Sequence, residues 1–441
     1  MVAIANAIFV VAAVYSAGVA VYVFAQYGAP GDMRQLGLAV VPAAVSGLLL
    51  LALRMRPAWR VRVAAAMVST SVSLWGLELV SGWVLSVDPL DTFSLRTEGF
   101  DRRTRSEVVE GLRRDGVKAY PSIIPKELLY EIDGGVVRSR IALGNTEVVP
   151  LGGIAAVPTV FCNESGAYVV YRSGEQGFHN PPGPWPPPPI DVLALGDSFT
   201  HGACVSSEQN MVSRLRQRYA RVVNLGMAGN GPLIMLAGLR EYGTALRPKH
   251  VIWFYFEGND LNADLLGERK SPVLRRYLED GFQQGLLSRQ GAVDAQLVAY
   301  VDRAMAVADT PAPTLRLDNF VLLRTLRNIT GWTYGPSEED VDLFAEILRQ
   351  AQAATASWGG QLHFVYLPIW NSVVPPRSAY FRSMDERVTA VVEGLHIPSL
   401  DMYEVFQRQH NHEGLFVYPR SHYGAEGYRV VAEAVLEHLN R

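Results

Sequence analysis

The sequence has few cysteines, little net charge and no tandem repeats. There are two cysteines among 441 residues, so at most one disulfide can form. The formal net charge is −3 at pH 7, which provides no basic field to attract nucleic acid, and we expect no nucleic-acid partner. Without repeats or low-complexity tails, the length predicts two or three ordinary regions.

The two cysteines, Cys162 and Cys204, leave two interpretations open. An unpaired couple of buried cysteines would behave as small hydrophobic side chains. In an oxidising compartment the same two residues can form one disulfide. The sequence does not show whether their Cβ atoms come within bonding reach, so both interpretations stand.

Residues 1–87 are far more apolar than the rest of the chain. Three apolar runs, Ile4–Ala25, Leu36–Leu53 and Val63–Val87, are each close to the about 20 residues that cross a bilayer. No Lys or Arg precedes the first run, so we interpret it as a retained helix rather than a signal peptide. The segment predicts a three-helix transmembrane anchor in a lipid bilayer.

Arginine placement predicts the orientation of this anchor. The stretch Arg54–Arg62 holds four arginines, whereas Tyr27–Gln35 holds only Arg34. The positive-inside rule places the arginine-rich loop in the cytoplasm. We therefore expect a cytoplasmic N-terminus in a plasma (inner) membrane, with everything after Val87 periplasmic or otherwise extracytoplasmic. Glu78, within the third run, is expected to reach the outer interface.

The remaining sequence predicts an accessory region at 88–189 and an α/β domain at 190–441. The accessory region contains a charged helix at Arg102–Asp115, short strands within Ala155–Tyr171, and a stiff proline strap at Pro181–Pro189. From Ile190 onward, apolar strands alternate with amphipathic helices, which predicts a parallel sheet covered on both faces. The expected strands are Asp191–Leu195, Arg221–Leu225, His250–Phe256, Gln361–Pro368 and Ile397–Met402. The expected helices are Glu208–Tyr219, Pro232–Tyr242, Glu338–Trp358, Ser383–Leu395 and Ala425–Asn440.

The stretch at 261–334 is longer than a connection in a minimal domain needs to be. It contains amphipathic sequence such as Val273–Leu278 and Leu317–Leu326. We expect a helical insertion, either an ordinary cap on the sheet, a lid, a membrane-surface element or a docking face.

Four short motifs carry the chemistry. They read Leu-Gly-Asp-Ser at 195–198, Asn-Leu-Gly-Met-Ala-Gly-Asn at 224–230, Gly-Asn-Asp at 258–260 and Ser-His-Tyr-Gly-Ala-Glu-Gly-Tyr at 421–428. The first presents a serine at the carboxyl end of a strand, where α/β sheets place their chemistry. In this order the four motifs resemble the blocks of the SGNH (GDSL) hydrolase superfamily. The resemblance implies a flavodoxin-like, three-layer domain with a five-stranded parallel sheet.

The resemblance also assigns roles to residues. Ser198 is the expected nucleophile and His422 the expected base. The expected oxyanion hole combines the backbone N–H groups of Ser198 and Gly229 with the side chain of Asn259, while Gly226 is a lower-ranked alternative to Gly229. Since Cys204 lies just after the first block, a bridge to Cys162 would pin the segment before the domain onto the active-site helix.

Other candidate residues receive lesser roles. His201 lies three residues after the serine, so we expect it to line the pocket or pack rather than act as the base. The run His410–Glu413 matches no closed zinc site and is interpreted as an exposed loop. Asp197 and Asp260 are expected to support the turns that carry Ser198 and Asn259. We expect no metal and no organic cofactor.

One residue of the family pattern is missing. SGNH hydrolases usually carry an aspartate two or three residues before the histidine, where this chain has Arg420 and Pro419. A serine–histidine dyad oriented by a backbone carbonyl, another carboxylate such as Glu413 or Asp401, or a catalytically weak site would each account for the loss.

The resemblance implies a membrane-anchored serine esterase acting on acyl, notably acetyl, esters of envelope or exported polysaccharide. Three alternatives remain at this point. They are an O-acyltransferase that works with a multi-span membrane acyltransferase, a non-catalytic subunit that binds glycan or a partner enzyme, and a lipid esterase with 261–334 as an apolar lid.

Overall fold

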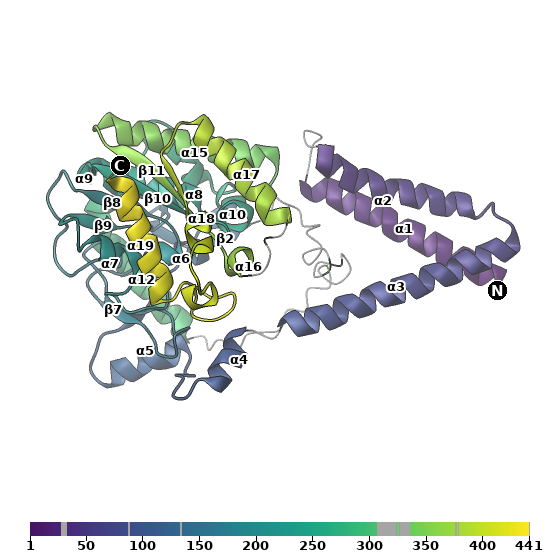
Figure 1. Ribbon diagram of the computed structural model, residues 1–441, viewed down its shortest axis with the longest axis horizontal. Coiled ribbons are helices and arrows are strands. Elements are labelled where there is room, and N and C mark those ends of the chain that lie inside the picture. Colours follow the sequence, from purple (N-terminus) through teal and green to yellow (C-terminus); the bar gives the residue numbers. More distant parts are fainter. Residues whose placement is uncertain are drawn as a thin grey trace. The chain divides into compact units, whose positions relative to one another are not determined.

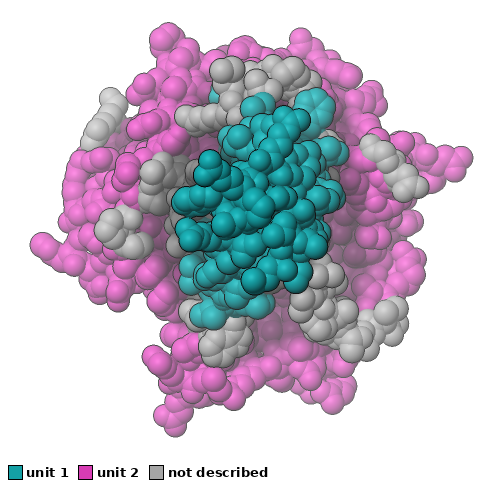
Figure 2. All heavy atoms as spheres, turned by 90° about the vertical axis from the view of Figure 1, so that its right-hand side faces the viewer, with its two compact units in different colours: residues 1–87, 312–338 teal, residues 88–311, 339–441 magenta. Residues whose placement is uncertain are grey.

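The computed structural model describes residues 1–27, 33–86, 89–132, 135–306, 323, 326, 336–374, 377 and 379–440. These residues form two compact units, coloured separately in Figure 2. Unit 1 comprises Met1–Val87 with Ala312–Glu338, and unit 2 comprises Asp88–Pro311 with Glu339–Arg441. The accessory region is thus part of the same compact unit as the α/β sheet.

Unit 1 contains three apolar helices, α1 (Val2–Tyr27), α2 (Met33–Ala52) and α3 (Pro57–Ser86). Among the described residues, two stretches are long and apolar enough to cross a membrane, Val2–Tyr22 and Pro57–Ser81. The expectation of three spans is therefore corrected to two candidates. The middle run does form a helix, but its described apolar part, Val40–Ala52, is shorter than the about 20 residues needed to cross a bilayer.

Glu78 lies on α3 and is 4% exposed. Its Oε2 accepts a hydrogen bond of 2.8 Å from the backbone N–H of Leu326, which belongs to the same unit. This contact gives the buried carboxylate the hydrogen-bond donor that it needs.

The centre of unit 2 is the expected five-stranded parallel sheet (Figure 1). Its strands are β8 (Val192–Leu195), β9 (Val222–Asn224), β10 (His250–Phe256), β11 (Gln361–Leu367) and β12 (Ser399–Asp401), in the order β12-β11-β10-β8-β9. Every pairing is parallel. Side chains point alternately to two buried cores, so Leu193 and Trp253 face one core while Ala194 and Phe254 face the other. The α/β fold predicted from the sequence is confirmed.

Helices cover both faces of the sheet. One core receives side chains from α8 (Pro232–Gly238), α15 (Glu338–Ser357) and α17 (Ala379–Gly394). The other receives them from α7 (Met211–Leu215), α18 (Met402–Gln407) and α19 (Ala425–Leu439). Shorter helical segments are α6 (Ser198–His201), η2 (Leu239–Gly243), α9 (Thr244–Leu246), α16 (Trp370–Val373) and η5 (Glu413–Leu415).

The described part of the accessory region consists of short helical segments and short strands. The helices are α4 (Pro89–Arg96), α5 (Arg105–Arg114) and the 3-10 turn η1 (Pro125–Leu128); the strands are β1 (Tyr120–Pro121), β2 (Leu129–Glu131), β3 (Val137–Ser139), β4 (Ile141–Leu143), β5 (Thr146–Val148), β6 (Pro158–Val160) and β7 (Val170–Arg172). Strands β6 and β7 pair antiparallel and form a hairpin. The tip of this hairpin, residues 161–169, lies at the active site described below.

The described part of the insertion is helical. It contains η3 (Asp260–Asp264), α10 (Leu265–Glu268), α11 (Pro272–Arg275), η4 (Arg276–Leu278) and α12 (Leu286–Ala306). Leu274 and Leu297 are buried in the core on one sheet face, so this part packs as a cap on the domain. Most of the expected segment Leu317–Leu326 lies outside the described residues.

Candidate active site

The strand β8 and the helix α6 place Ser198 at the carboxyl edge of the sheet. Asp197 caps α6, and its Oδ1 accepts a hydrogen bond of 3.0 Å from the N–H of Phe199. Gly196 makes the sharp turn possible, because a Cβ there would lie 2.1 Å from Oγ1 of Thr200. The serine therefore begins a helix directly after a buried strand.

His422 reaches Ser198 from the loop before α19. Its Nε2 lies 2.9 Å from Oγ of Ser198. The loop is fixed by the N–H of Val417, which donates to the carbonyl oxygen of His422 at 3.1 Å, and by Ser421, whose hydroxyl donates to the carbonyl oxygen of Tyr418 at 2.6 Å. The imidazole is thus held against the serine by the fold of the loop that precedes the last helix.

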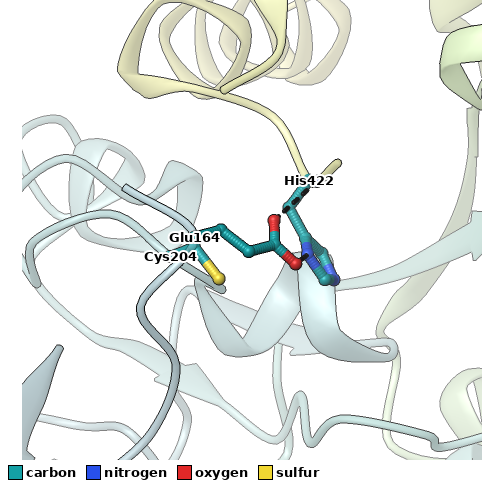
Figure 3. A group of neighbouring side chains, drawn as sticks. All are labelled: Glu164, Cys204 and His422. Atoms are coloured by element: carbon teal, nitrogen blue, oxygen red, sulfur yellow. Dashed lines mark hydrogen bonds and ion pairs between the residues drawn. The ribbon is translucent and has the colours of Figure 1, made fainter. Parts of the chain in front are cut away.

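Glu164 provides a carboxylate in place of the aspartate of the family pattern, which this chain lacks. Its Oε1 lies 2.8 Å from Nδ1 of His422, and its Oε2 accepts the backbone N–H of His422 at 3.0 Å. Since a carboxylate accepts, Nδ1 carries a proton and Nε2 presents a lone pair to Ser198. The three side chains form a Ser198–His422–Glu164 relay, and Figure 3 shows the carboxylate facing the imidazole.

Charge coupling in this pair opposes the effect of burial. Burial alone would lower the pKa of His422, but the charge and hydrogen bond of Glu164 outweigh it and raise that pKa above its usual 6.5. Burial raises the pKa of Glu164, and the charge and hydrogen bonds of His422 outweigh this and lower it. The glutamate therefore stays ionised and stabilises the protonated imidazole.

The carboxylates proposed from sequence as substitutes lie elsewhere. Asp401 caps α18 by accepting the N–H of Tyr403 at 2.8 Å, and Glu413 is exposed in η5. Sequence reasoning missed Glu164 because it searched near the histidine and within the α/β domain, whereas Glu164 lies 258 residues before His422 in the accessory region. The available signal was its position two residues after Cys162, whose bridge to Cys204, left open by the sequence, would tie this segment to the active-site helix.

The oxyanion-hole candidates surround the same edge of the sheet. Gly229 has a φ of +73°, a conformation that favours glycine. No acceptor is found among the described residues for the backbone N–H of either Ser198 or Gly229. Asn259 follows β10 at the start of η3. Backbone N–H groups free to donate are what a developing oxyanion requires.

Gly226 and His201 have packing roles. A Cβ on Gly226 would lie 2.6 Å from the backbone N of His201, so this glycine permits close contact with α6. His201 is fully buried, and its Nδ1 accepts the N–H of Ala228 at 3.3 Å. This contact holds the segment that leads into Gly229.

Asp197 and Asp260 are fully buried beside the site. Oδ2 of Asp260 accepts the N–H of Phe256 at 3.0 Å, at the end of β10. Burial raises the pKa of Asp197 to about 7, and burial together with Asp197 and Asp264 raises that of Asp260. Oδ2 of Asp197 lies 3.4 Å from Oγ of Ser198, farther than the imidazole. The contacts of both aspartates are to the turns that carry Ser198 and Asn259.

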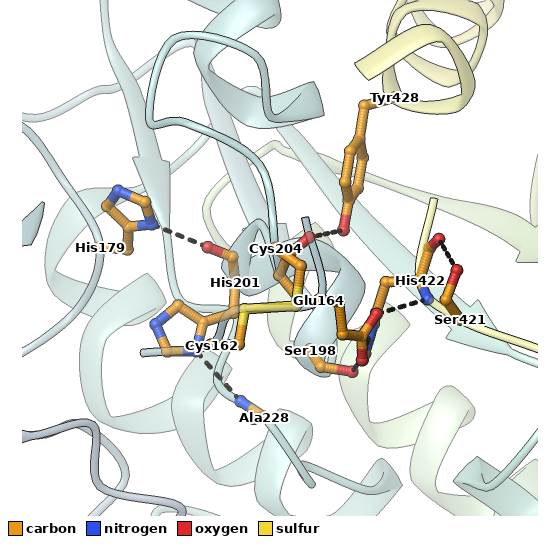
Figure 4. The surroundings of a disulfide bond; sticks show 11 residues. Cys162, Glu164, His179, Ser198, His201, Cys204, Ala228, Ser421, His422 and Tyr428 are labelled. Atoms are coloured by element: carbon orange, nitrogen blue, oxygen red, sulfur yellow. Dashed lines mark hydrogen bonds and ion pairs between the residues drawn. A yellow bond between two sulfur atoms is a disulfide. The ribbon is translucent and has the colours of Figure 1, made fainter. Parts of the chain in front are cut away.

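Glu164, Cys204 and His422 each place a potential metal-ligand atom within 4.8 Å of the others. Cys204 is bonded to Cys162 in a disulfide, with Cα atoms 5.4 Å apart (Figure 4). A disulfide sulfur is not a thiolate ligand, and Nδ1 and Nε2 of His422 already face Glu164 and Ser198. The donor set therefore fits a proton relay better than a metal centre.

Comparison with known families decides the assignment. Residues 194–430 match the model of the GDSL-like lipase/acylhydrolase family. The chain belongs to this family. The predicted membership of the SGNH (GDSL) superfamily is confirmed, and with it an ester-hydrolysing enzyme class. Among curated proteins none matches the chain.

Several solved structures are similar to part of the chain. A putative lipolytic protein of the G-D-S-L family from Desulfitobacterium hafniense is 17% identical, with a TM-score of 0.33, covering 56% of this chain and 99% of that one. The lipase/acylhydrolase from Enterococcus faecalis is 14% identical, with a TM-score of 0.34 and coverages of 57% and 95%. A mutant of Axe2, an acetyl-xylooligosaccharide esterase from Geobacillus, is 15% identical, with a TM-score of 0.34 and coverages of 57% and 94%.

Proposed function

We propose that this GDSL-family chain is a membrane-associated serine esterase that acts outside the cytoplasm on acyl esters of carbohydrate. The observation that carries the proposal is the continuous contact from Ser198 through His422 to Glu164. A serine hydroxyl is a weak nucleophile until an adjacent, oriented base takes its proton. The relay has that base and the group that orients it.

The reaction follows from these contacts. Nε2 of His422 takes the hydroxyl proton while Oγ of Ser198 bonds to the ester carbonyl carbon. The tetrahedral intermediate then expels the alcohol, which takes the proton from His422. Water attacks the acyl-enzyme, gives a proton to His422, and the acid leaves as that proton returns to Oγ. Glu164 stabilises the imidazolium during both steps.

The oxyanion receives donors from three separate blocks. The N–H groups of Ser198 and Gly229 and the side-chain amide of Asn259 are the proposed donors. Each such donor contributes roughly 2.7–4 kcal/mol of transition-state stabilisation in other hydrolases. The same geometry weakens the case for a non-catalytic subunit, since that interpretation rested on an absent acid and Glu164 occupies its place.

The extracytoplasmic location is supported by two independent features. Arg54–Arg62 spans the loop before α3 and the first two turns of that helix, so the positive-inside rule places the far end of α3, and unit 2 beyond it, outside whether α2 crosses or not. The disulfide between Cys162 and Cys204 suits an oxidising compartment. Along α1 and α3 apolar side chains such as Val14 and Val72 are 68% and 66% exposed, which suits contact with lipid.

The activity test is covalent labelling of the full-length protein in detergent with a fluorophosphonate. We expect wild type to be labelled and both Ser198→Ala and His422→Ala to be unlabelled. Ser206→Ala is the matched control, because Ser206 is exposed and makes no side-chain hydrogen bond among the described residues. An unlabelled wild type, or labelling that survives Ser198→Ala, contradicts the proposal.

A substrate panel tests the carbohydrate assignment. Acetylated sugars and short-chain esters should be hydrolysed faster than long-chain esters by the same preparation. A preference for long acyl chains would instead identify a lipid esterase. Transfer of the acyl group to an added sugar, in competition with water, would identify an acyltransferase.

A further inference from the structure

We propose that the Cys162–Cys204 disulfide is a positioning element of catalysis, which holds Glu164 against His422. The proposal rests on the serine esterase function above and deepens it. It makes the accessory region a contributor to the active site and ties full activity to the oxidised state of the only cysteine pair in the sequence.

Glu164 is carried by the tip of the β6–β7 hairpin. The N–H of Phe161 donates to the carbonyl oxygen of Val169 at 2.9 Å, and the N–H of Val169 donates to that of Cys162 at 2.8 Å, which closes the hairpin. Beyond Cys162 the chain turns, and the N–H of Gly166 donates to the carbonyl oxygen of Asn163 at 2.9 Å. The glutamate thus lies past the last ladder pair, on a turn rather than in a strand.

Polar contacts tie this tip to the accessory region itself. Nδ2 of Asn163 donates to the carbonyl oxygen of Asp101 at 2.7 Å, and the hydroxyl of Tyr168 donates to that of Arg103 at 2.8 Å. These bonds fix the turn to the segment before α5. They do not fix it to the sheet that carries Ser198.

The disulfide joins the tip covalently to the nucleophile segment. Cys204 lies six residues after Ser198, just beyond α6, and is fully buried. The N–H of Ala203 donates to the carbonyl oxygen of Ser198 at 2.9 Å, so Cys204 directly follows a turn closed on the serine. Figure 4 shows the bridge lying beside Glu164 and Ser198.

Packing of apolar groups supplements the bridge. Phe161, Tyr171 and Ala203 form a small buried cluster with Cys204, and the ring of Phe161 stacks on His201 with centroids 3.9 Å apart. The hydroxyl of Tyr171 also lies 2.7 Å from Nε2 of His201 on α6. Phe161 and Tyr171 make these contacts, whereas Glu164 lies on the turn beyond them and must keep its carboxylate within hydrogen-bond reach of Nδ1 of His422 to orient it. The sulfur of Cys204 lies within 4.8 Å of both the carboxylate and the imidazole, so the bridge restrains Glu164 at short range.

The test uses full-length protein in detergent and the double variant Cys162→Ser/Cys204→Ser. Without the bridge we expect kcat to fall about tenfold or more, since general-base efficiency depends on the oriented carboxylate. The acid limb of kcat/KM should move to lower pH, because His422 loses the charge that raises its pKa. A bridge with a purely structural role would lower the melting temperature and leave the acid limb in place.

Reduction gives a second measurement on the unmodified chain. Dithiothreitol donates two electrons and two protons, becomes its cyclic disulfide, and leaves Cys162 and Cys204 as thiols. We expect the same loss of kcat and the same acid-limb shift, both reversed on reoxidation. Measurements well below the melting temperature separate these effects from unfolding.

The decisive comparison is a double-mutant cycle with Glu164→Gln. If the bridge acts through Glu164, removing the bridge from the Glu164→Gln variant should cost little further activity. It should also leave the acid limb of kcat/KM where it is in Glu164→Gln. Equal losses in both backgrounds overturn the proposal. The proposal is also overturned if the bridge-free variant is as active as wild type, provided that fluorophosphonate labels wild type and does not label Ser198→Ala. If wild type is unlabelled, the esterase function itself has failed, which is a separate result.

Discussion

At the scale of single residues, Glu164 makes the sharpest prediction. Glu164→Gln should lower kcat by about 10²–10⁴-fold. The His422 imidazolium loses its counter-charge, and the neutral ring loses the carboxylate that keeps its proton on Nδ1. Glu164 raises the pKa of His422, so its neutralisation should also shift the acid limb of kcat/KM toward lower pH. Steady-state kinetics between pH 4 and 9 measure both effects, with pH values chosen around the usual histidine pKa of about 6.5. Glu413→Gln, an exposed glutamate away from the relay, is the control and should resemble wild type.

Asn259 is the second residue with a predicted kinetic signature. Asn259→Ala should reduce kcat by about 10²–10³-fold with little change in KM, since an oxyanion donor acts mainly in the transition state. A rise in KM alone would place Asn259 in ground-state binding instead. Ser206→Ala again serves as the unaffected variant.

The sequence predicts those site residues that lie in a recognisable short motif. Ser198, Gly229, Asn259 and His422 lie in short motifs whose spacing is set by the strands and helices around them. Glu164 carries no such motif, because its partner is distant in the chain and meets it only through tertiary packing of the β6–β7 hairpin. The same packing brings Cys162 to Cys204, which the sequence left open.

At the scale of elements, the contact between α6 and the segment after β9 predicts a stability effect. A Cβ on Gly226 would lie 2.6 Å from the backbone N of His201 and from Cβ of Thr200. Gly226→Ala should therefore destabilise the fold by about 1–3 kcal/mol, as overpacking does. Thermal unfolding measures the loss. Gly267→Ala in α10, where no atom lies within 4 Å of the added Cβ, should be neutral or stabilising. Equal melting temperatures for the two variants would show that α6 can shift to accommodate the methyl group.

Helices and strands could be predicted where a short stretch of sequence carries their hydrophobic pattern. The strands β8 and β10 are continuous apolar runs, and their positions match the expectation to within a residue. The expected helix Pro232–Tyr242 is divided into α8 and the π-helix η2, a change of hydrogen bonding that hydrophobic periodicity does not reveal. The second apolar run, Leu36–Leu53, was expected to cross a membrane because of its length, but the apolar helix described within it is only Val40–Ala52.

At the scale of the whole molecule, buried neutral histidines predict sensitivity to acid. At the amino ends of β10 and β11, Nε2 of His363 lies 3.1 Å from Nδ1 of His250, and its Nδ1 lies 3.3 Å from Nε2 of His438. Burial, with the two neighbouring histidines, lowers the pKa of His363 from 6.5 to about 4. The folded state favours the neutral ring of His363. The contribution of this ring to the stability of the folded state is therefore present above pH 6.5 and is lost as the pH falls toward about 4.

His363→Gln tests this contribution. The melting temperature of wild type should fall as the pH drops from 6.5 to 4, and the variant should fall less over the same window, since glutamine does not titrate. His179, whose pKa burial also lowers to about 4, remains in the variant and will preserve part of the slope. Parallel curves for the two proteins would mean that His363 does not carry the effect.

The orientation of the chain in a membrane is the last prediction. An alkaline phosphatase fused after Arg441 should be active in a bacterium, because that reporter folds only in an oxidising compartment and the arginines at the start of α3 hold the near end of this helix inside. Replacing Arg54, Arg56, Arg60 and Arg62 by glutamine should lower the reporter's activity by weakening that bias, whereas Arg34→Gln should leave it unchanged. An inactive wild-type fusion would place unit 2 in the cytoplasm. There Cys162 and Cys204 would be kept as thiols, so the orientation of the chain decides whether the bridge that restrains Glu164 can form.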